Sequence, residues 1–156
     1  INVFVVGVGV QDEREINDIV SSPTDETKYL VDSTDDLEWM PDVVFSQMCI
    51  RLQSQVVNVL RASNRVDLAF LLHFSNEMTE ESLEKIKGFM KNMISKANID
   101  SGDVRVGAAV YRRRAFPMFR LNQYDTKAAV QSGIDSININ YRSASASAAA
   151  GLDVVR

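Results

Sequence analysis

The chain has 156 residues, a formal net charge of −4 at pH 7 and 46% apolar residues. Its length and composition are those of one soluble globular domain, and the acidic balance argues against a nucleic acid or an anionic membrane surface as partner. Membrane insertion is not expected, because the longest apolar run, Val3 to Val10, is too short to cross a bilayer.

The chain lacks an initiator methionine, which predicts an internal piece of a longer protein. Its single cysteine, Cys49, excludes an internal disulfide. In a secreted parent, Cys49 would be able to pair with a cysteine outside this piece. In a cytosolic parent it would behave as a small hydrophobic residue. Both alternatives are open at this point.

The first predicted element is a strand over residues 3–9, whose unbroken apolar run is typical of a strand buried on both faces of a parallel sheet. Gly7 and Gly9 invite a dinucleotide-binding interpretation. That motif requires a third glycine where Asp12 stands, so we reject it. We expect Asp12 instead to cap a helix and Glu15 to complete a capping box.

A short strand is predicted over residues 28–31, followed by a helix from about Leu37 to Leu52. Apolar residues recur along this helix at helical spacing: Leu37, Met40, Val44, Met48 and Leu52. Pro41 leaves two alternatives, a helix that starts at the proline or one that kinks there. Residues 53–65 are predicted to be a linker.

The next strand ends in the most informative loop of the chain. The apolar run Leu68 to Leu72 is followed by His73, Ser75 and Glu77, and Thr79 then opens a helix. Loops at the carboxyl ends of parallel strands are where α/β proteins bind ligands, so this loop is the first place to look for function.

The rest of the chain continues the alternation of helices and strands. An amphipathic helix after Thr79 has one apolar face that we assign to core packing: Leu83, Ile86, Phe89, Met90, Met93 and Ile94. A strand over residues 104–111 leads through Arg112, Arg113 and Arg114 into a strand over residues 115–121, which Pro117 places at the sheet edge. Asp125 is predicted to cap a last helix, which Gly133 weakens.

Two segments of the chain resemble the von Willebrand factor A-like domain. Residues 67–156 are similar to its first half, with the strands DLAFLLH and VRVGAAVY and the edge strand FRLNQYD. Residues 1–48 are similar to its second half, with the strands INVFVVGVG and TKYLVDS and the closing helix DDLEWMPDVVFSQMC. The resemblance implies an open, mainly parallel, doubly wound α/β sheet with an antiparallel edge strand, Rossmann-like in class.

The two halves stand in reversed order, and the combined pattern looks most like a collagen VI-type α chain. It implies a piece cut from a tandem array, with residues 1–52 ending one A domain, residues 53–65 linking, and residues 66–156 beginning the next. The family's central strand would then be missing. The halves would either close into one permuted sheet, which we favour, or stay as two incomplete units with exposed strand edges.

The resemblance also implies a metal site. In ligand-binding members of the family, a motif Asp-x-Ser-x-Ser, a distant Thr and an Asp hold a magnesium ion that an acidic ligand completes, which suits a hard cation. Here the motif positions are His73, Ser75 and Glu77, and Ala146 stands where the Thr is expected. We predict a degenerate loop with no cofactor. The alternative is a repurposed site at these three residues, which would bind Mg²⁺ or Mn²⁺ only if it still functions.

The three adjacent arginines, Arg112 to Arg114, are the second candidate site. Guanidinium groups bind sulfate and carboxylate through paired hydrogen bonds, so this triplet favours a sulfated glycosaminoglycan or an acidic patch of a partner as ligand. A solvated turn is the plainer alternative.

The predicted function is that of a secreted, non-enzymatic structural and protein-interaction module of the extracellular matrix. No Ser/His/Asp set, acid and base pair or phosphate loop points to an enzyme. Expected partners are matrix proteins such as collagens and neighbouring A domains. The main rival is a metal-dependent adhesion domain that grips an acidic side chain of a cell-surface or collagen ligand.

Overall fold

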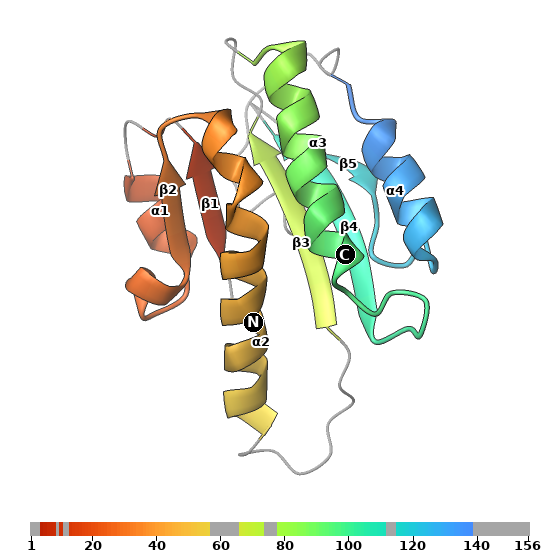
Figure 1. Ribbon diagram of the computed structural model, residues 1–156, viewed down its shortest axis with the longest axis horizontal. Helices are drawn as coiled ribbons and strands as arrows, with labels where there is room; N and C mark the ends of the chain where they lie inside the picture. Colours follow the sequence, from red (N-terminus) through yellow and green to blue (C-terminus); the bar gives the residue numbers. More distant parts are fainter. Residues whose placement is uncertain are drawn as a thin grey trace. The chain divides into compact units, whose positions relative to one another are not determined.

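The computed structural model describes residues 4–8, 10, 13–56, 66–73, 78–111 and 115–138. The chain folds as two compact units, unit 1 (Ile1–Ser63) and unit 2 (Asn64–Arg156). Strands alternate with helices in both units, and the described strands pair in parallel except at one edge (Figure 1). The predicted open, mainly parallel α/β class with an antiparallel edge strand is therefore confirmed.

Unit 1 is built on two parallel strands, β1 (Val5–Val8) and β2 (Lys28–Val31). The connection between them contains helix α1 (Arg14–Ile19) and the 3₁₀ helix η1 (Thr24–Glu26). Both predicted strands are confirmed within these bounds. The valines of β1 are half-buried rather than fully buried, because β2 is the only strand that pairs with β1 in the described part of the chain.

The start of α1 differs from the prediction. Glu13 is the N-cap residue and makes no side-chain cap hydrogen bond, so the capping box predicted from Asp12 to Glu15 is wrong by one residue; Asp12 itself lies outside the described residues. The Glu13 carboxylate instead pairs with Lys28, with 2.7 Å between Oε2 and Nζ. The same ammonium group donates to Asn17 Oδ1 at 2.9 Å. These contacts tie the start of α1 to β2.

Close packing explains why residue 7 is a glycine, and no nucleotide-binding role is needed. A Cβ added at Gly7 would lie 2.7 Å from Leu30 Cδ2 and 2.7 Å from Val10 Cγ2, closer than non-bonded carbons approach. Since no side chain fits between these groups, β1 needs a glycine there to pack against β2. The rejection of the nucleotide motif thus agrees with a structural reason for the residue.

The long helix of unit 1 settles the question that Pro41 raised. A 3₁₀ helix, η2 (Thr34–Glu38), comes first, and Ser33 closes a capping box with Asp36 at its start. Helix α2 (Met40–Val56) then begins, with Pro41 in its first turn, where no hydrogen-bonded amide is required. The helix therefore starts at the proline instead of kinking. It also continues four residues into the predicted linker, whose remaining residues 57–65 lie outside the described part.

Unit 2 contains a sheet in the order β3-β4-β5, made of β3 (Val66–His73), β4 (Val104–Tyr111) and β5 (Ala115–Phe119). β3 and β4 are parallel along their whole length, and β5 is antiparallel to β4. The predicted strands and the edge position of the strand with Pro117 are confirmed. β4 is the central strand of these three, and its side chains from Val106 to Val110 are buried.

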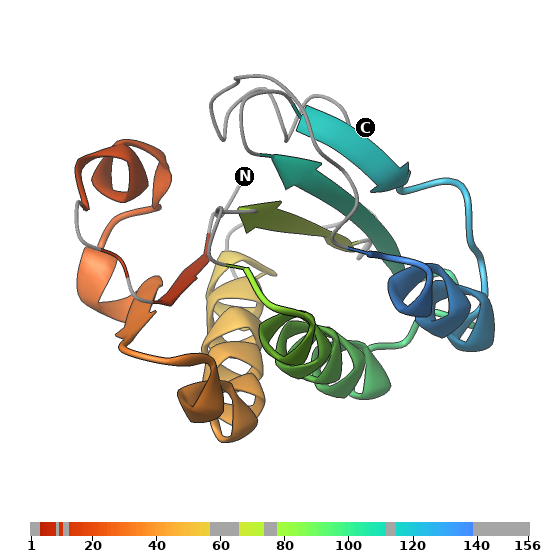
Figure 2. The same cartoon turned by 90° about the horizontal axis from the view of Figure 1, so that it is seen from above.

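Helices α3 (Glu80–Ser95) and α4 (Lys127–Asp135) lie on the same face of this sheet, as Figure 2 shows. Thr79 caps α3 as predicted, because its Oγ1 accepts a hydrogen bond of 3.0 Å from the amide of Ser82. The predicted apolar face is confirmed for the side chains that are almost fully buried: Leu83, Met90, Met93 and Ile94. These side chains form the core between helix and sheet.

The cap of α4 is displaced by one residue from the prediction. Thr126, not Asp125, has the extended backbone of an N-cap, and its Oγ1 accepts from the amide of Ala129 at 3.2 Å. The next amide, of Lys127, donates to Asp100 Oδ1 at 2.8 Å. A side chain distant in sequence therefore satisfies a helix amide that local sequence reasoning had assigned to Asp125.

Gly133 allows α4 to pack closely on the end of the sheet. A Cβ at this position would lie 2.6 Å from Tyr124 Cε2 and 3.1 Å from Phe119 Cδ1. The two rings themselves pack at 5.3 Å between centroids. The sequence showed only that a glycine weakens the helix; its benefit comes from rings that are nine or more residues away.

We predict that Gly133→Ala destabilises the protein by about 1–3 kcal/mol, because the added methyl group must displace one of the two rings. Gly88 is the matched control, since it lies within α3 and a Cβ there would meet nothing within 4 Å. Gly88→Ala should raise the free energy of unfolding by up to about 1 kcal/mol. Urea unfolding followed by circular dichroism measures both changes, and equal effects of the two variants would contradict the packing role of Gly133.

Candidate functional site

The loop after β3 begins at the edge of the sheet where the sequence predicted it. His73 is the last residue of β3 and is exposed, and Thr79 caps α3 after the loop. The other two predicted site residues, Ser75 and Glu77, lie outside the described residues. The structure thus confirms the strand, the loop position and the helix start, while the contacts within the loop stay a prediction.

The register of the parallel strands connects this loop with the second candidate site. His73 is level with Tyr111, the last residue of β4, so both strands end at the same edge. Tyr111 also pairs with Ala115 of the antiparallel strand β5. Arg112, Arg113 and Arg114 therefore form the connection of the β4–β5 hairpin, although the arginines themselves lie outside the described residues.

The loop after β3 and the connection between β4 and β5, which the sequence analysis treated as separate sites, therefore leave the sheet from neighbouring strand ends. Adjacent strands lie about 4.8 Å apart, so His73 and Tyr111, the last residues of β3 and β4, are close together. Among the described residues, the acidic residues nearest to the loop after β3 in the sequence are Glu80 and Glu81 in the first turn of α3. Glu81 pairs with Lys85 at 2.9 Å.

The opposite end of the same strand pair carries an ion pair that fixes the register. Asp67 of β3 is level with Arg105 of β4, and the guanidinium group binds both carboxylate oxygens, with Nε to Oδ1 at 2.8 Å and Nη2 to Oδ2 at 2.7 Å. The hydrogen bond and the charge of Asp67 raise the pKa of Arg105 above its ordinary value. Both groups are exposed and far along the strands from His73, so the pair is structural.

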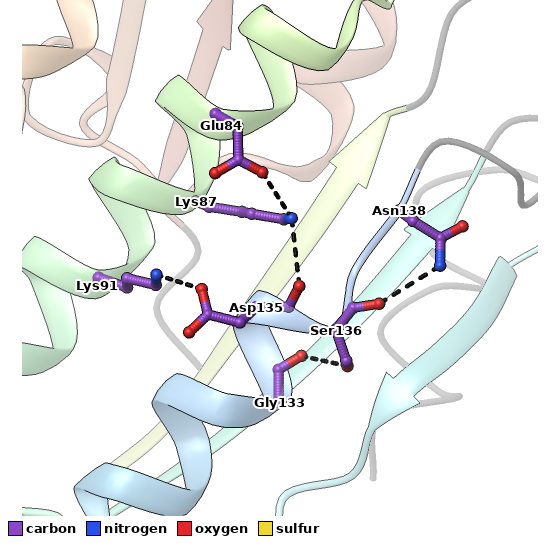
Figure 3. Close-up of polar contacts among 7 residues, drawn as sticks. All are labelled: Glu84, Lys87, Lys91, Gly133, Asp135, Ser136 and Asn138. Carbon is purple, nitrogen blue, oxygen red and sulfur yellow. Dashed lines mark hydrogen bonds and ion pairs between the residues drawn. The ribbon is translucent and has the colours of Figure 1, made fainter.

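A buried lysine joins α3 to α4. Lys87 is only 7% exposed, and its Nζ donates to Glu84 Oε1 at 2.8 Å and to the backbone oxygen of Asp135 at 3.3 Å (Figure 3). Lys91 of the next turn forms an ion pair with the Asp135 carboxylate. A positive charge thus meets the negative end of α4 and satisfies one of its free carbonyl groups. Sequence reasoning missed this contact, although Lys87 falls between Leu83 and Met90 on the predicted apolar face.

Buried polar groups elsewhere are also accounted for. Thr27 is fully buried, and its Oγ1 lies 3.0 Å from the backbone oxygen of Pro23 and also contacts that of Ser21. Cys49 is a free, half-buried residue of α2. Within the part of the chain that the structure describes, no group of three or more His, Cys, Asp or Glu side chains is placed to hold a metal ion.

The comparison with known families decides the identity of the fold. The model of the von Willebrand factor type A domain matches residues 67–156. The chain belongs to this family. The predicted resemblance is therefore confirmed for more than half of the sequence, and this matched region covers the described part of unit 2 from the second residue of β3 onward.

Known A-domain proteins extend the similarity to nearly the whole chain. The collagen alpha-4(VI) chain of Mus musculus is 26% identical over 160 residues, covering 99% of this chain and 7% of its own length. The collagen alpha-5(VI) chain of Homo sapiens is 24% identical, covering 89% of this chain and 5% of its own. The chain thus spans less than a tenth of these relatives.

The solved structure of proximal thread matrix protein 1 (PTMP1) from the mussel byssus with zinc occupied MIDAS motif is also similar. It has a TM-score of 0.48 and 20% sequence identity, over 97% of this chain and 37% of that one.

The family match and the collagen VI relatives confirm the predicted similarity to an A domain of a collagen VI-type chain. Collagen VI chains are extracellular matrix proteins, so the predicted localisation in the matrix is confirmed at the level of the family of chains. In the described residues, none of the helices is both long enough and apolar enough to span a membrane.

Proposed function

We propose that this A domain piece is a non-enzymatic structural and protein-interaction module of a collagen VI-type matrix chain, and that its strand-end loop has lost the metal site. The observation that carries the proposal is the register of His73 with Tyr111. It brings an imidazole, in place of the family's leading carboxylate, to the same edge as the three arginines.

The donor chemistry at this edge supports a loop without metal. Mg²⁺ and Mn²⁺ prefer oxygen ligands, whereas imidazole suits zinc or copper. Arg112 to Arg114 add positive charge beside the loop, which further weakens the binding of any divalent cation. The second candidate function is a metal-dependent adhesion domain using His73, Ser75 and Glu77, and metal binding is what separates it from the first.

The same arginines favour an anionic partner. A guanidinium group binds sulfate or carboxylate through two parallel hydrogen bonds, and three adjacent groups in a hairpin connection present several such donors. We therefore propose that this edge binds a sulfated glycosaminoglycan or an acidic patch of another matrix protein. Neighbouring A domains and collagens belong to the same class of partner.

We further propose that the two units are halves of consecutive A domains, with residues 66–156 beginning the second. The predicted end of the first domain at residue 52 then extends with α2 to Val56. Three findings support this boundary. The chain divides into compact units between Ser63 and Asn64, and the family match starts at residue 67. The parallel pairs β1–β2 and β3–β4 also belong to separate sheets in the described residues.

The first prediction is a melting temperature that does not respond to metal ions. An ion that binds only the folded state at about 100 times its Kd adds about 2.7 kcal/mol to the free energy of unfolding. Thermal melts of the intact chain with EDTA, then with Mg²⁺, Mn²⁺ or Zn²⁺, should coincide. A rise in the midpoint that His73→Ala abolishes would revive the metal-dependent adhesion function.

The second prediction concerns the arginines. Replacing Arg112, Arg113 and Arg114 by alanine should lower the salt concentration at which the chain elutes from heparin. The control variant replaces Lys96, Arg120 and Lys127 in unit 2, which removes the same charge away from the strand-end loops. It should elute close to the unmodified chain. An unchanged elution of the arginine variant, or an equal shift of both, would refute a specific anion site.

The third prediction tests whether the two units unfold separately, as their separate sheets favour, or close into one permuted sheet, as the sequence led us to expect. Trp39, the single tryptophan, lies in unit 1 and reports its unfolding by fluorescence, while far-ultraviolet circular dichroism follows both units. Leu83→Ala removes a fully buried side chain from unit 2 and should destabilise that unit by about 2–5 kcal/mol. The dichroism transition should shift in urea while the Trp39 transition stays. Coincident shifts of both probes would instead show one cooperative domain.

A further inference from the structure

Unit 1 exposes large apolar side chains on helix α2. Among the described residues, four large apolar side chains are strongly exposed, and all belong to unit 1: Leu30 (36%), Trp39 (56%), Val43 (40%) and Ile50 (53%). Trp39 directly precedes α2 and has helical backbone angles, with φ −90° and ψ −17°. Three of the four therefore lie along one helical segment.

These three side chains form a single stripe. Together with the exposed Ser46, they are spaced by four, three and four residues, which places them on one side of a helix. The stripe is about 16 Å long at 1.5 Å per residue. A separate set of α2 and η2 side chains is buried in the core of unit 1: Leu37, Met40 and Val44. Because burial of apolar side chains is favourable, a helix that is apolar on two sides is expected to be covered on both.

Charge is distributed unevenly along this stripe. Residues 32–42 contain five acidic residues, whereas residues 43–56 contain none and carry Arg51 as their only charge. The acidic end therefore coincides with Trp39, and the end without acids coincides with Ile50. Two such helices packed in parallel would bring the acidic ends together, while antiparallel packing places each beside the acid-free half of the other.

We propose that the stripe of Trp39, Val43, Ser46 and Ile50, called the α2 stripe, packs against the same stripe of a second copy of this chain, with the two helices antiparallel. With the two-fold axis between Val43 and Ser46, Trp39 lies opposite Ile50 of the second copy and Val43 lies opposite Ser46. The contact is isologous, so one stripe serves both copies.

The small side chain of Ser46 near the axis lets the two helices approach closely, as ridges packing into grooves require. A contact made by one helix from each copy falls at the low end of the sizes of specific interfaces, below about 1,200 Å². The dimer is therefore weak, with a Kd on the order of 10 µM to 1 mM. The inference stands apart from the proposed function, because it uses neither the strand-end loop nor the arginines.

The experiment is a concentration series of the intact chain from about 1 µM to about 1 mM. Sedimentation equilibrium measures the mass, and the fluorescence of Trp39 reports its burial. We expect a monomer to become a dimer while the Trp39 emission moves to the blue, both with the same midpoint. A chain that stays monomeric overturns the proposal, whether its emission is unshifted or already blue at every concentration because the chain covers its own stripe.

Two variants place a carboxylate in the α2 stripe, Val43→Glu and Ile50→Glu, and each should weaken dimerisation at least tenfold. Both sites are exposed, so the fold should persist, as a melt of each variant checks. Leu30→Glu is the matched control, an exposed apolar residue of unit 1 outside the stripe. A dimer that survives both stripe variants, or that the control weakens equally, contradicts an interface at α2.

Crosslinking tests the antiparallel orientation in a Cys49→Ala background. Ser46→Cys should form a disulfide-linked dimer, because the two residues lie about 4.5 Å apart along the axis of the pair. Ile50→Cys should not, because its two copies lie about 16 Å apart. The reverse result would exclude antiparallel packing.

Discussion

The register between β3 and β4 is the constraint on which the candidate site depends. Parallel strands with continuous pairing cannot shift by one residue without turning every side chain to the opposite face. Here the pairing runs from Val66 with Val104 to His73 with Tyr111. The exposed ion pair of Asp67 and Arg105 holds the far end of the ladder. At the other end of the ladder, where His73 and Tyr111 lie, two loops therefore leave the sheet from the same edge.

The helices that cover this sheet are held by contacts of two kinds. Leu83, Met90 and Ile94 bring α3 onto the sheet through apolar burial. Lys87 instead reaches the carboxyl end of α4 and is nearly buried, which is tolerated because Glu84 and a carbonyl group receive its hydrogen bonds. The lysine thereby fixes where the chain leaves α4. That exit leads to the segment containing Ala146, which lies outside the described residues.

The sequence predicted the elements well where periodicity or capping was local. The apolar run of β3, the helical spacing of α3 and the cap at Thr79 are all confirmed. Errors arose where a distant side chain competed with a local one. The Glu13 carboxylate at the start of α1 binds Lys28 of β2 and makes no cap hydrogen bond, and the first amide of α4 binds Asp100, so the local sequence misplaced both helix starts by one residue. The close contacts at Gly7 and Gly133 were likewise invisible, since their neighbours belong to other elements. Of the site, only the placement of His73 and the flanks of the arginine hairpin were tested.

Pro117 makes the β5 edge of the unit 2 sheet a poor site for pairing with a further strand. It is exposed in β5, the outer antiparallel strand, and its ring nitrogen has no hydrogen to donate. A strand added there would meet a gap in the row of donors, which is how natural sheets discourage aggregation at their edges. An edge that resists the recruitment of other strands leaves association on that side to side chains, because backbone pairing there is unfavourable.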